Sequence, residues 1–229
     1  MNRQIFSRKP QAAAFTLIEL LTVIAIIAVL MGLLFPALSG AKEQARRADA
    51  GVALRNIVAA CKSYQTDYGK FPPVATATDS SGISSFGDKN EGKCKDNNST
   101  LFDILRSINR GANVDYKMNK RQSKYIEGKM ANDKKNPRNG FCDGTDFVAY
   151  AGQYMDPWGA QYCIVLDAAD NGTLDMSGFY GDLTAANPVR VSAAGFSMGK
   201  DNKRGGKGYY GQLRKPNSSE APDDIVSWQ

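Results

Sequence analysis

The sequence contains no histidine. This absence excludes Ser-His and Cys-His nucleophilic systems and every His-ligated metal site, which together account for much of hydrolytic chemistry. Cysteine is also scarce, and no two cysteines form a CxxC pair, so the sequence gives no support for a zinc ribbon or a thioredoxin-like motif. The four cysteines are Cys61, Cys94, Cys142 and Cys163. An enzymatic function is therefore not expected.

In an oxidising compartment outside the cytoplasm these cysteines could form disulfides, and four cysteines permit three pairings. Cys94 and Cys142 lie in the polar middle of the chain, where a covalent staple would be most useful. We therefore expect Cys94–Cys142 as the first pairing. The alternative, in which two or more of the thiols stay free, is left open by the sequence.

Excess charge is small as well. Lys and Arg number 29 against 23 Asp and Glu, which gives a net charge of +6. Three of the cations, Arg3, Arg8 and Lys9, lie in the first 14 residues, so the rest of the chain carries 26 against 23, or +3. A net charge of this size does not indicate strong nucleic-acid binding.

One long apolar run dominates the N-terminal part of the chain. Phe15 to Leu38, FTLIELLTVIAIIAVLMGLLFPAL, contains 24 residues and one ionisable side chain, Glu19. At about 1.5 Å per residue, the run is long enough to cross the ~30 Å hydrocarbon core of a bilayer as one helix. The sequence predicts a membrane-inserted helix, weakened near Pro36 because proline removes a backbone donor.

Glu19 is anomalous in this run, because an acid in a spanning helix costs at least ~2.5 kcal/mol unless it is paired or lies near the interface. Upstream of the run lie a short basic leader and the mostly small residues 10–14. This layout is typical of a processed N-terminus. Cleavage between Ala14 and Phe15 would place the new α-ammonium of Phe15 one helical turn from Glu19.

The stretch SRKPQAAAFTLIELLTVIAIIAVLMGLLFPAL resembles the signal of type IV pilins and type II secretion pseudopilins. Phe15, Glu19 and Pro36 fall on the matching places of that signal. The resemblance implies cleavage by a prepilin peptidase between Ala14 and Phe15, N-methylation of Phe15, and assembly through Glu19 and Pro36. The chain departs from the family at Ala14, where Gly is usual.

Two simpler interpretations explain less of this stretch. A cleaved secretory signal usually has an apolar core of ~7–15 residues, and an acid within that core would be unusual. A plain single-pass anchor accounts for the length of the run and gives Glu19 and Pro36 no role. If the apolar run stays in the membrane, the basic leader favours a cytoplasmic N-terminus. The chain after Leu38 would then lie on the other side of the membrane.

Residues 39–70 are predicted to continue as an amphipathic stalk helix. The segment 39–68 lacks proline, and its apolar residues recur at spacings of three and four, as on one face of a helix. These residues are Leu54, Ile57, Val58, Cys61, Tyr64 and Tyr68. The outer half of the helix is therefore expected to dock on a globular head and to end at Gly69.

Residues 71–140 are predicted to form a loop-rich insertion with one short helix. The segment 74–100 is rich in Ser, Thr, Asp, Asn and Gly and indicates a long loop, whereas 99–108 has the spacing of a short helix. From Arg110 to Arg138 nine Lys or Arg face three acids, with Tyr116 and Tyr125 interleaved. This pattern favours a solvated insertion over a nucleic-acid surface.

Residues 141–229 are predicted to form strands. The β-prone runs are 147–150, 162–166 and 189–191, with turn residues at 156–159 and at 170–172. The Asn-Gly at 171–172 favours a hairpin, since both residues tolerate positive φ. An EF-hand beginning at Asp167 is disfavoured, because its third and twelfth positions are Ala169 and Gly178 and two expected ligands are missing. The expected fold class is α+β: a long N-terminal helix packed on a small antiparallel sheet, pilin-like, with a polar insertion and a C-terminal loop.

Three C-terminal motifs resemble those of type II secretion major pseudopilins. They are DPWG at 156–159 with Tyr162, SMGKDNKRGG at 197–206, and DIVSW at 224–228. In that family the last loop holds a calcium ion, and calcium takes oxygen ligands from carboxylates and carbonyls. The resemblance implies Asp201 and Asp224 as side-chain ligands and Met198 as a carbonyl donor. Asp223 is a neighbouring candidate. Residues 207–222 make the gap between Asp201 and Asp223 longer than is usual in that family.

The sequence thus predicts a structural subunit that polymerises through its N-terminal helix into a periplasmic pseudopilus of a type II protein secretion system. Expected partners are further copies of the chain, other pseudopilins, the prepilin peptidase and the inner-membrane assembly platform. The expected location is the bacterial inner membrane, single-pass, with the C-terminal domain in the periplasm.

Two alternatives remain at this stage. One is a surface type IV pilin or DNA-uptake minor pilin, whose basic insertion would touch nucleic acid. The other is a membrane-anchored enzyme with two facing carboxylates, as in glycosidases, although no acid pair in the sequence stands out.

Overall fold

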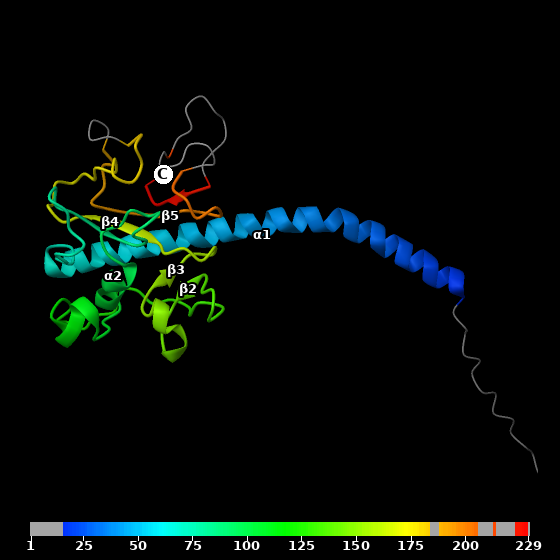
Figure 1. The fold of residues 1–229 in the computed structure, drawn as a ribbon, viewed down its shortest axis with the longest axis horizontal. Helices are drawn as coiled ribbons and strands as arrows, with labels where there is room; N and C mark the ends of the chain where they lie inside the picture. The colour runs from blue at the N-terminus through cyan, green and yellow to red at the C-terminus, as the bar shows by residue number, and fades with distance from the viewer. Residues whose placement is uncertain (1–15, 184–187, 206–212, 214–222, 229) are drawn as a thin grey trace, which may run out of the picture. The chain divides into compact units, whose positions relative to one another are not determined.

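The computed structural model describes residues 16–183, 188–205, 213 and 223–228 (Figure 1). The chain divides into two compact units, with the boundary between Ala45 and Arg46. Helix α1, Leu17–Tyr68, has 52 residues and contributes to both units. The long N-terminal helix and the small antiparallel sheet described below confirm the α+β class.

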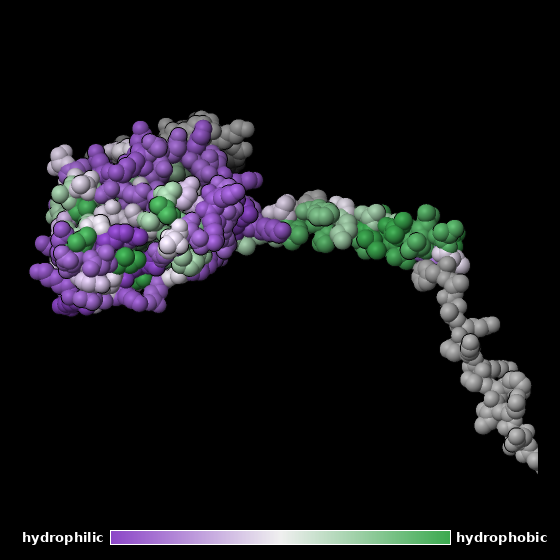
Figure 2. Space-filling view, turned by 60° about the horizontal axis from the view of Figure 1, so that its bottom comes forward, coloured by the Kyte–Doolittle hydropathy of each residue, from purple (hydrophilic) through white to green (hydrophobic). Residues whose placement is uncertain are grey.

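In the first unit, the apolar part of α1 is exposed along its described residues. Every described side chain from Thr16 to Phe35 is exposed, and the large apolar ones range from 46% exposed at Val23 to 89% at Leu17. Figure 2 shows these apolar residues in green along the segment. The helix is long and apolar enough to cross a membrane, as judged by its length and composition. An apolar surface of this extent requires lipid or another protein to cover it.

The second unit contains the rest of α1, two sheets and short helices. The larger sheet has four antiparallel strands in the order β1–β4–β5–β6. Its strands are β1 (Ile83–Phe86), β4 (Cys163–Asp167), β5 (Ala193–Ser197) and β6 (Ile225–Val226). The smaller sheet pairs β2 (Gly140–Phe141) with β3 (Tyr154–Met155). The described part of this unit also contains helix α2 (Asn98–Leu105) and two 3₁₀ segments, Gly111–Tyr116 and Thr145–Tyr150.

The predicted apolar face of the stalk helix is the centre of the main core. Leu54, Ile57 and Cys61 are 0% exposed and Tyr64 is 2% exposed. They pack in one cluster with residues of β1, β4 and α2, among them Phe86, Ile164 and Phe102. In Figure 1 the larger sheet and α2 lie on opposite sides of this part of α1.

The end of α1 follows the prediction. Gly69 has φ +72°, and its N–H donates to the carbonyl of Gln65 at 2.7 Å. Glycine adopts this left-handed conformation without the steric cost of a Cβ, which is why helices commonly end there.

Strand β5 lies close against α1, which explains its small residues. A Cβ added to Gly195 would lie 3.0 Å from Cδ2 of Leu54, closer than ordinary van der Waals contact. The sequence AAGFS has low β-propensity, and for this reason β5 was not predicted.

Several predicted elements differ in the structure. Residues 74–100, predicted as a long loop, contain the edge strand β1. The run at 147–150, predicted as a strand, belongs to a 3₁₀ segment. The run at 189–191 forms only an isolated bridge, between Val189 and Leu174. The short helix predicted at 99–108 is α2, which begins one residue earlier and ends three residues sooner.

The predicted Asn-Gly hairpin is a turn of another kind. Asp170 and Gly172 have positive φ, and the N–H of Gly172 donates to the carboxylate of Asp167 at 2.6 Å. However, β4 pairs with β5, which begins only at Ala193. The turn therefore opens a long connection, and Asp167 serves as its hydrogen-bond acceptor.

Candidate assembly segment and metal site

Glu19 closes a capping box at the start of α1. Its Oε2 accepts 2.8 Å hydrogen bonds from the backbone N–H and the hydroxyl of Thr16. In return, the N–H of Glu19 donates to the Thr16 hydroxyl at 3.3 Å. This reciprocal pattern satisfies backbone donors that the first turn of a helix otherwise leaves unpaired. Glu19 thus has a partner within its own chain.

Sequence reasoning missed this role, although the signal was present. Thr followed three residues later by Glu, immediately before an apolar run, is the pattern of a capping box. The predicted cleavage and methylation sites, Ala14 and Phe15, lie outside the described residues. Pro36 lies within α1, which the structure shows as helical on both sides of it.

The pairing of β5 with β6 brings the two halves of the predicted metal site together. Ser197 is opposite Ile225 in the ladder, so the residues after β5 lie beside those before β6. The N–H of Asp201 donates to Oδ2 of Asp223 at 3.1 Å. A Cβ added to Gly199, which has φ +66°, would lie 2.4 Å from the carbonyl oxygen of Asp223. Glycine is therefore required at this crossing of the chain.

Asp224 is the most perturbed carboxylate of this region. Its Oδ2 accepts hydrogen bonds from the hydroxyl of Tyr180 at 2.6 Å and from the N–H of Gly205 at 2.8 Å. Its Oδ1 is buried and has no hydrogen-bond partner among the described residues. Burial, together with the negative charges of Asp223 and Asp201, raises the pKa of Asp224 to about 7.

The fit to calcium is partial. A buried carboxylate oxygen without a hydrogen-bond partner, whose charge is opposed by the charges of two further acids, is an environment that a divalent cation would stabilise. On the other hand, in the part of the chain that is described, no three acidic or thiol side chains converge as a metal-binding group. Met198 directly follows β5 and its residue is 2% exposed. Most of 207–222, which would complete the loop, lies outside the described residues.

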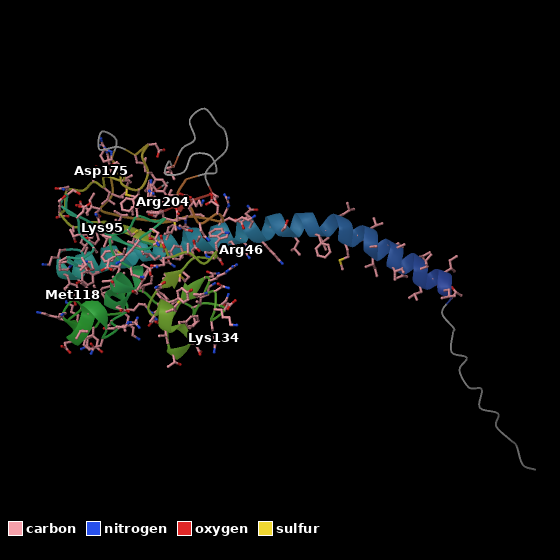
Figure 3. The ribbon with its side chains drawn as sticks, viewed as in Figure 1. Arg46, Lys95, Met118, Lys134, Asp175 and Arg204 are labelled. Atoms are coloured by element: carbon pink, nitrogen blue, oxygen red, sulfur yellow. The ribbon has the colours of Figure 1, made fainter. Side chains whose placement is uncertain are left out.

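We call the segment after β5 that carries Asp201 the acidic loop. Arg204, labelled in Figure 3, connects this loop to two other segments. Its Nε–H donates to the carbonyl of Glu91, and its Nη1–H donates to the carbonyl of Phe179. The segment that follows β1 thus contacts the loop that follows β5.

The DPWG motif forms a tight turn around its own aspartate. Asp156 is 0% exposed, and its Oδ1 accepts hydrogen bonds from the N–H groups of Trp158, Gly159 and Ala160 at 2.8–2.9 Å. Gly159 has φ +102°, a conformation that favours glycine. The motif is therefore a structural turn, and its acid is fully engaged inside the protein.

The two cysteines of the expected first pairing, Cys94 and Cys142, lie apart in the structure. All four cysteines are buried free thiols, and Cys94 and Cys142 lie in different apolar clusters. Cys94 shares its cluster with Cys163, whereas Cys61 belongs to the main core. The structure therefore does not bring the predicted Cys94–Cys142 pair together.

The basic insertion is folded and largely engaged in internal contacts. Five of its nine cations lie within 4.0 Å of an acid: Arg110, Arg121, Lys124, Lys129 and Lys134. The ring of Tyr125 packs edge-on against Tyr64 at 5.6 Å, and its hydroxyl donates to Asp67 at 2.7 Å. An aromatic ring held in this way is not available to stack on a base.

Residues 9–35 match the family model described as the prokaryotic N-terminal methylation motif. This is the type IV pilin-like prepilin signal, and it covers the basic leader residue Lys9, the predicted cleavage site and Glu19. Comparison with curated proteins and comparison with solved structures each gave no match. The chain thus carries a type IV pilin-like N-terminal signal on a long apolar helix.

Proposed function

We propose that this protein is a major pseudopilin-like subunit that polymerises through α1 into a periplasmic filament of a type II secretion system. In this proposal a prepilin peptidase removes residues 1–14, and Phe15 becomes the methylated N-terminus. Further copies of the chain, other pseudopilins and the inner-membrane assembly platform are its partners. The C-terminal unit lies on the periplasmic side.

The observation that carries the proposal is the exposed apolar segment of α1 with one acid at its start. From Thr16 to Phe35 no described side chain is covered by the rest of the chain. A bilayer can cover the apolar residues, but it cannot pair the charge of Glu19. The α-ammonium of a neighbouring subunit can do so, and this pairing would fix the axial offset between subunits.

The capping box provides a rival role for Glu19 and hence a sharp test. Glu19→Gln removes the charge and keeps an oxygen that accepts from the Thr16 N–H. Thr16→Val keeps the charge and the side-chain volume and removes the hydroxyl that bonds Glu19. If Glu19 pairs with a neighbour, E19Q lowers filament yield about tenfold or more, while T16V stays within about twofold of wild type.

Filament yield is measured by electron microscopy and by quantifying sheared filaments from cells that express the assembly system. Carbonate extraction of membranes serves as a control that both variants insert. Normal filaments from E19Q, or an equal loss in T16V, would contradict the pairing of Glu19 with a neighbouring subunit.

We also propose that the acidic loop binds Ca²⁺ through Asp201 and Asp224, with Asp223 and the carbonyl of Met198 as neighbouring ligands. Support comes from the buried unpartnered Oδ1 of Asp224 and from its raised pKa of about 7. Bound calcium would neutralise the three acids and hold the loop after β5 against β6. The three pseudopilin-like motifs at the C-terminal end favour the secretion role over a surface pilin.

A further inference from the structure

Two cysteines that are distant in sequence meet where the segment after β1 crosses β4. A Cβ added to Gly87 would lie 2.7 Å from the sulfur of Cys163 and 2.9 Å from the sulfur of Cys94. The two sulfurs are therefore no farther apart than the sum of these two distances. A Cβ added to Gly92 would lie 2.6 Å from the sulfur of Cys163. Glycines thus surround the pair, and they leave the room that the sulfurs occupy.

The backbone on both sides of the pair is held in place. The N–H of Cys94 donates to the carbonyl of Asp88 at 2.9 Å, and the Asp88 carboxylate accepts from the N–H of Gly92 at 3.0 Å. Cys163 lies in β4, opposite Phe196 of β5. The contacts of the two sulfurs to backbone groups are weak and long: that of Cys94 to the carbonyl of Gly92 at 3.7 Å and that of Cys163 to the carbonyl of Gln161 at 4.0 Å. A disulfide between the two sulfurs would therefore remove only these weak hydrogen bonds to backbone carbonyls.

The other two cysteines have no comparable neighbour. The structure describes all four, and Cys61 and Cys142 each lie in a cluster that contains no second cysteine. Burial raises the pKa of Cys61 to about 12 and that of Cys142 to about 11, so both thiols are protonated and unreactive at neutral pH.

We propose that Cys94 and Cys163 form a disulfide that links the segment after β1 to strand β4 of the larger sheet. The proposal rests on the proposed location of the C-terminal unit outside the cytoplasm, where disulfides persist. The oxidant is a protein disulfide donor. One cysteine thiolate attacks the donor disulfide, and the second displaces the donor sulfur from the mixed disulfide. The pair loses two electrons and two protons, and the donor ends as two thiols.

Burial sets the order of events. Cys163 is 0% exposed and Cys94 is 5% exposed, so a donor protein cannot reach either sulfur after folding. Burial and the neighbouring Cys163 also raise the pKa of Cys94, which removes the thiolate needed for exchange. The bond therefore forms before the segment closes on β4, and afterwards it resists reductants until the unit unfolds.

The proposed disulfide would also stabilise the acidic loop. The segment that Cys94 anchors includes Glu91, whose carbonyl accepts the hydrogen bond from Arg204. A disulfide at Cys94 would thus restrain one contact surface of the loop that carries Asp201.

The test uses the full chain expressed in its bacterial membrane. Membranes are denatured in an alkylating reagent without reductant, digested, and analysed by mass spectrometry. The expected result is a linked peptide pair containing Cys94 and Cys163, with Cys61 and Cys142 alkylated. In the native detergent-solubilised protein the link should survive dithiothreitol, and it should be lost when denaturant is added.

Matched variants measure the effect on stability. Cys94→Ser with Cys163→Ser should lower the Tm by roughly 5–10 °C, and wild type reduced under denaturing conditions and refolded should show the same loss. Cys61→Ser with Cys142→Ser leaves the linked peptide intact. Four alkylated cysteines, or a link between Cys94 and Cys142, would overturn the proposal.

Protease accessibility from the periplasmic side separates this proposal from the proposed function. If a protease added from the periplasmic side digests the C-terminal unit and the thiols are free, the disulfide proposal is wrong and the proposed location is correct. If the unit is cytoplasmic, the location is wrong, and the pairing is tested by refolding the full chain in detergent with reduced and oxidised glutathione. The Cys94–Cys163 peptide is expected there too, and its absence would overturn the pairing.

Discussion

The hydroxyl of Ser197 donates a 2.6 Å hydrogen bond to Oδ2 of Asp156, and both residues are 0% exposed. The bond joins the DPWG turn to the last residue of β5, from which the acidic loop begins. The hydroxyl oxygen of Ser197 also accepts from the N–H of Gly199 at 3.3 Å. Two motifs that are 41 positions apart in sequence therefore form one hydrogen-bonded unit that positions the start of the loop.

Removing this bond should destabilise the protein. Ser197→Ala leaves a buried carboxylate oxygen without its donor, and we expect a loss of about 1.5–3 kcal/mol in the free energy of unfolding. Chemical denaturation of the full chain in detergent measures it. Ser81→Ala is the matched control, because Ser81 also donates to an aspartate at 2.6 Å but at an exposed site. A loss of ~0.5 kcal/mol or less is expected there, and equal losses in the two variants would contradict this account.

The pKa of Asp224 predicts how stability depends on pH. Its folded value of about 7 is above the ordinary 3.8, so the folded protein binds more protons than the unfolded chain between these values. The free energy of unfolding should therefore fall as pH rises from 4 to 7, by roughly 3–4 kcal/mol from this group, and level off above 7. Thermal unfolding of the full chain with a chelator present measures the fall.

The control for this prediction is Asp224→Asn, which cannot titrate. It should reduce the fall in the free energy of unfolding between pH 4 and 7 by the contribution of Asp224. At pH 7.5, calcium at about 100 times its Kd should raise the Tm of wild type by roughly 5–10 °C and that of D224N by much less. An equal response of both proteins to calcium would place the ion elsewhere.

The buried face of α1 should be the most sensitive part of the helix in the second unit. Leu54→Ala removes a side chain that is 0% exposed and should cost about 2–5 kcal/mol in the free energy of unfolding. Val52→Ala, at a residue 49% exposed on the same helix, should cost less than ~1 kcal/mol. Denaturation of both variants compares them, and similar losses would show that the core is not centred on this face.

Features encoded by local periodicity could be predicted from the sequence. The spacing of Leu54, Ile57 and Cys61 predicted the buried face of α1, and Gly69 predicted its end. The strand at 162–166 was predicted within one residue of β4, because its run of large β-branched and aliphatic residues is unambiguous. Asp201 and the pair Asp223 and Asp224 were selected from the C-terminal motifs, and the pairing of β5 with β6 brings the segments that carry them side by side.

Features that depend on distant contacts could not be predicted. Ser84 and Ser85 in β1 are polar yet buried, because their hydroxyls bond Thr78 and the N–H of Lys95. Position 195 of β5 is glycine because α1 passes close to it. The neighbourhood of Cys94 and Cys163 likewise arises from tertiary packing, since spacing alone permits every pairing.

The contacts of the basic insertion predict weak binding to nucleic acid. Five of the nine cations are paired to acids and Tyr125 is packed on Tyr64, which reduces the number of groups that can contact phosphates or stack on bases. Fluorescence anisotropy with labelled DNA, at low and at physiological salt, should show no saturable binding by the detergent-solubilised chain. Tight binding that weakens steeply with salt would instead favour a DNA-uptake pilin.

The central claim is that this chain is processed at its pilin-like signal and assembled through the exposed helix. The intact mass of the membrane-extracted protein tests it most directly. We predict a chain that lacks residues 1–14 and carries one methyl group on the α-amine of Phe15. A mature chain that still begins at Met1 would contradict the claim.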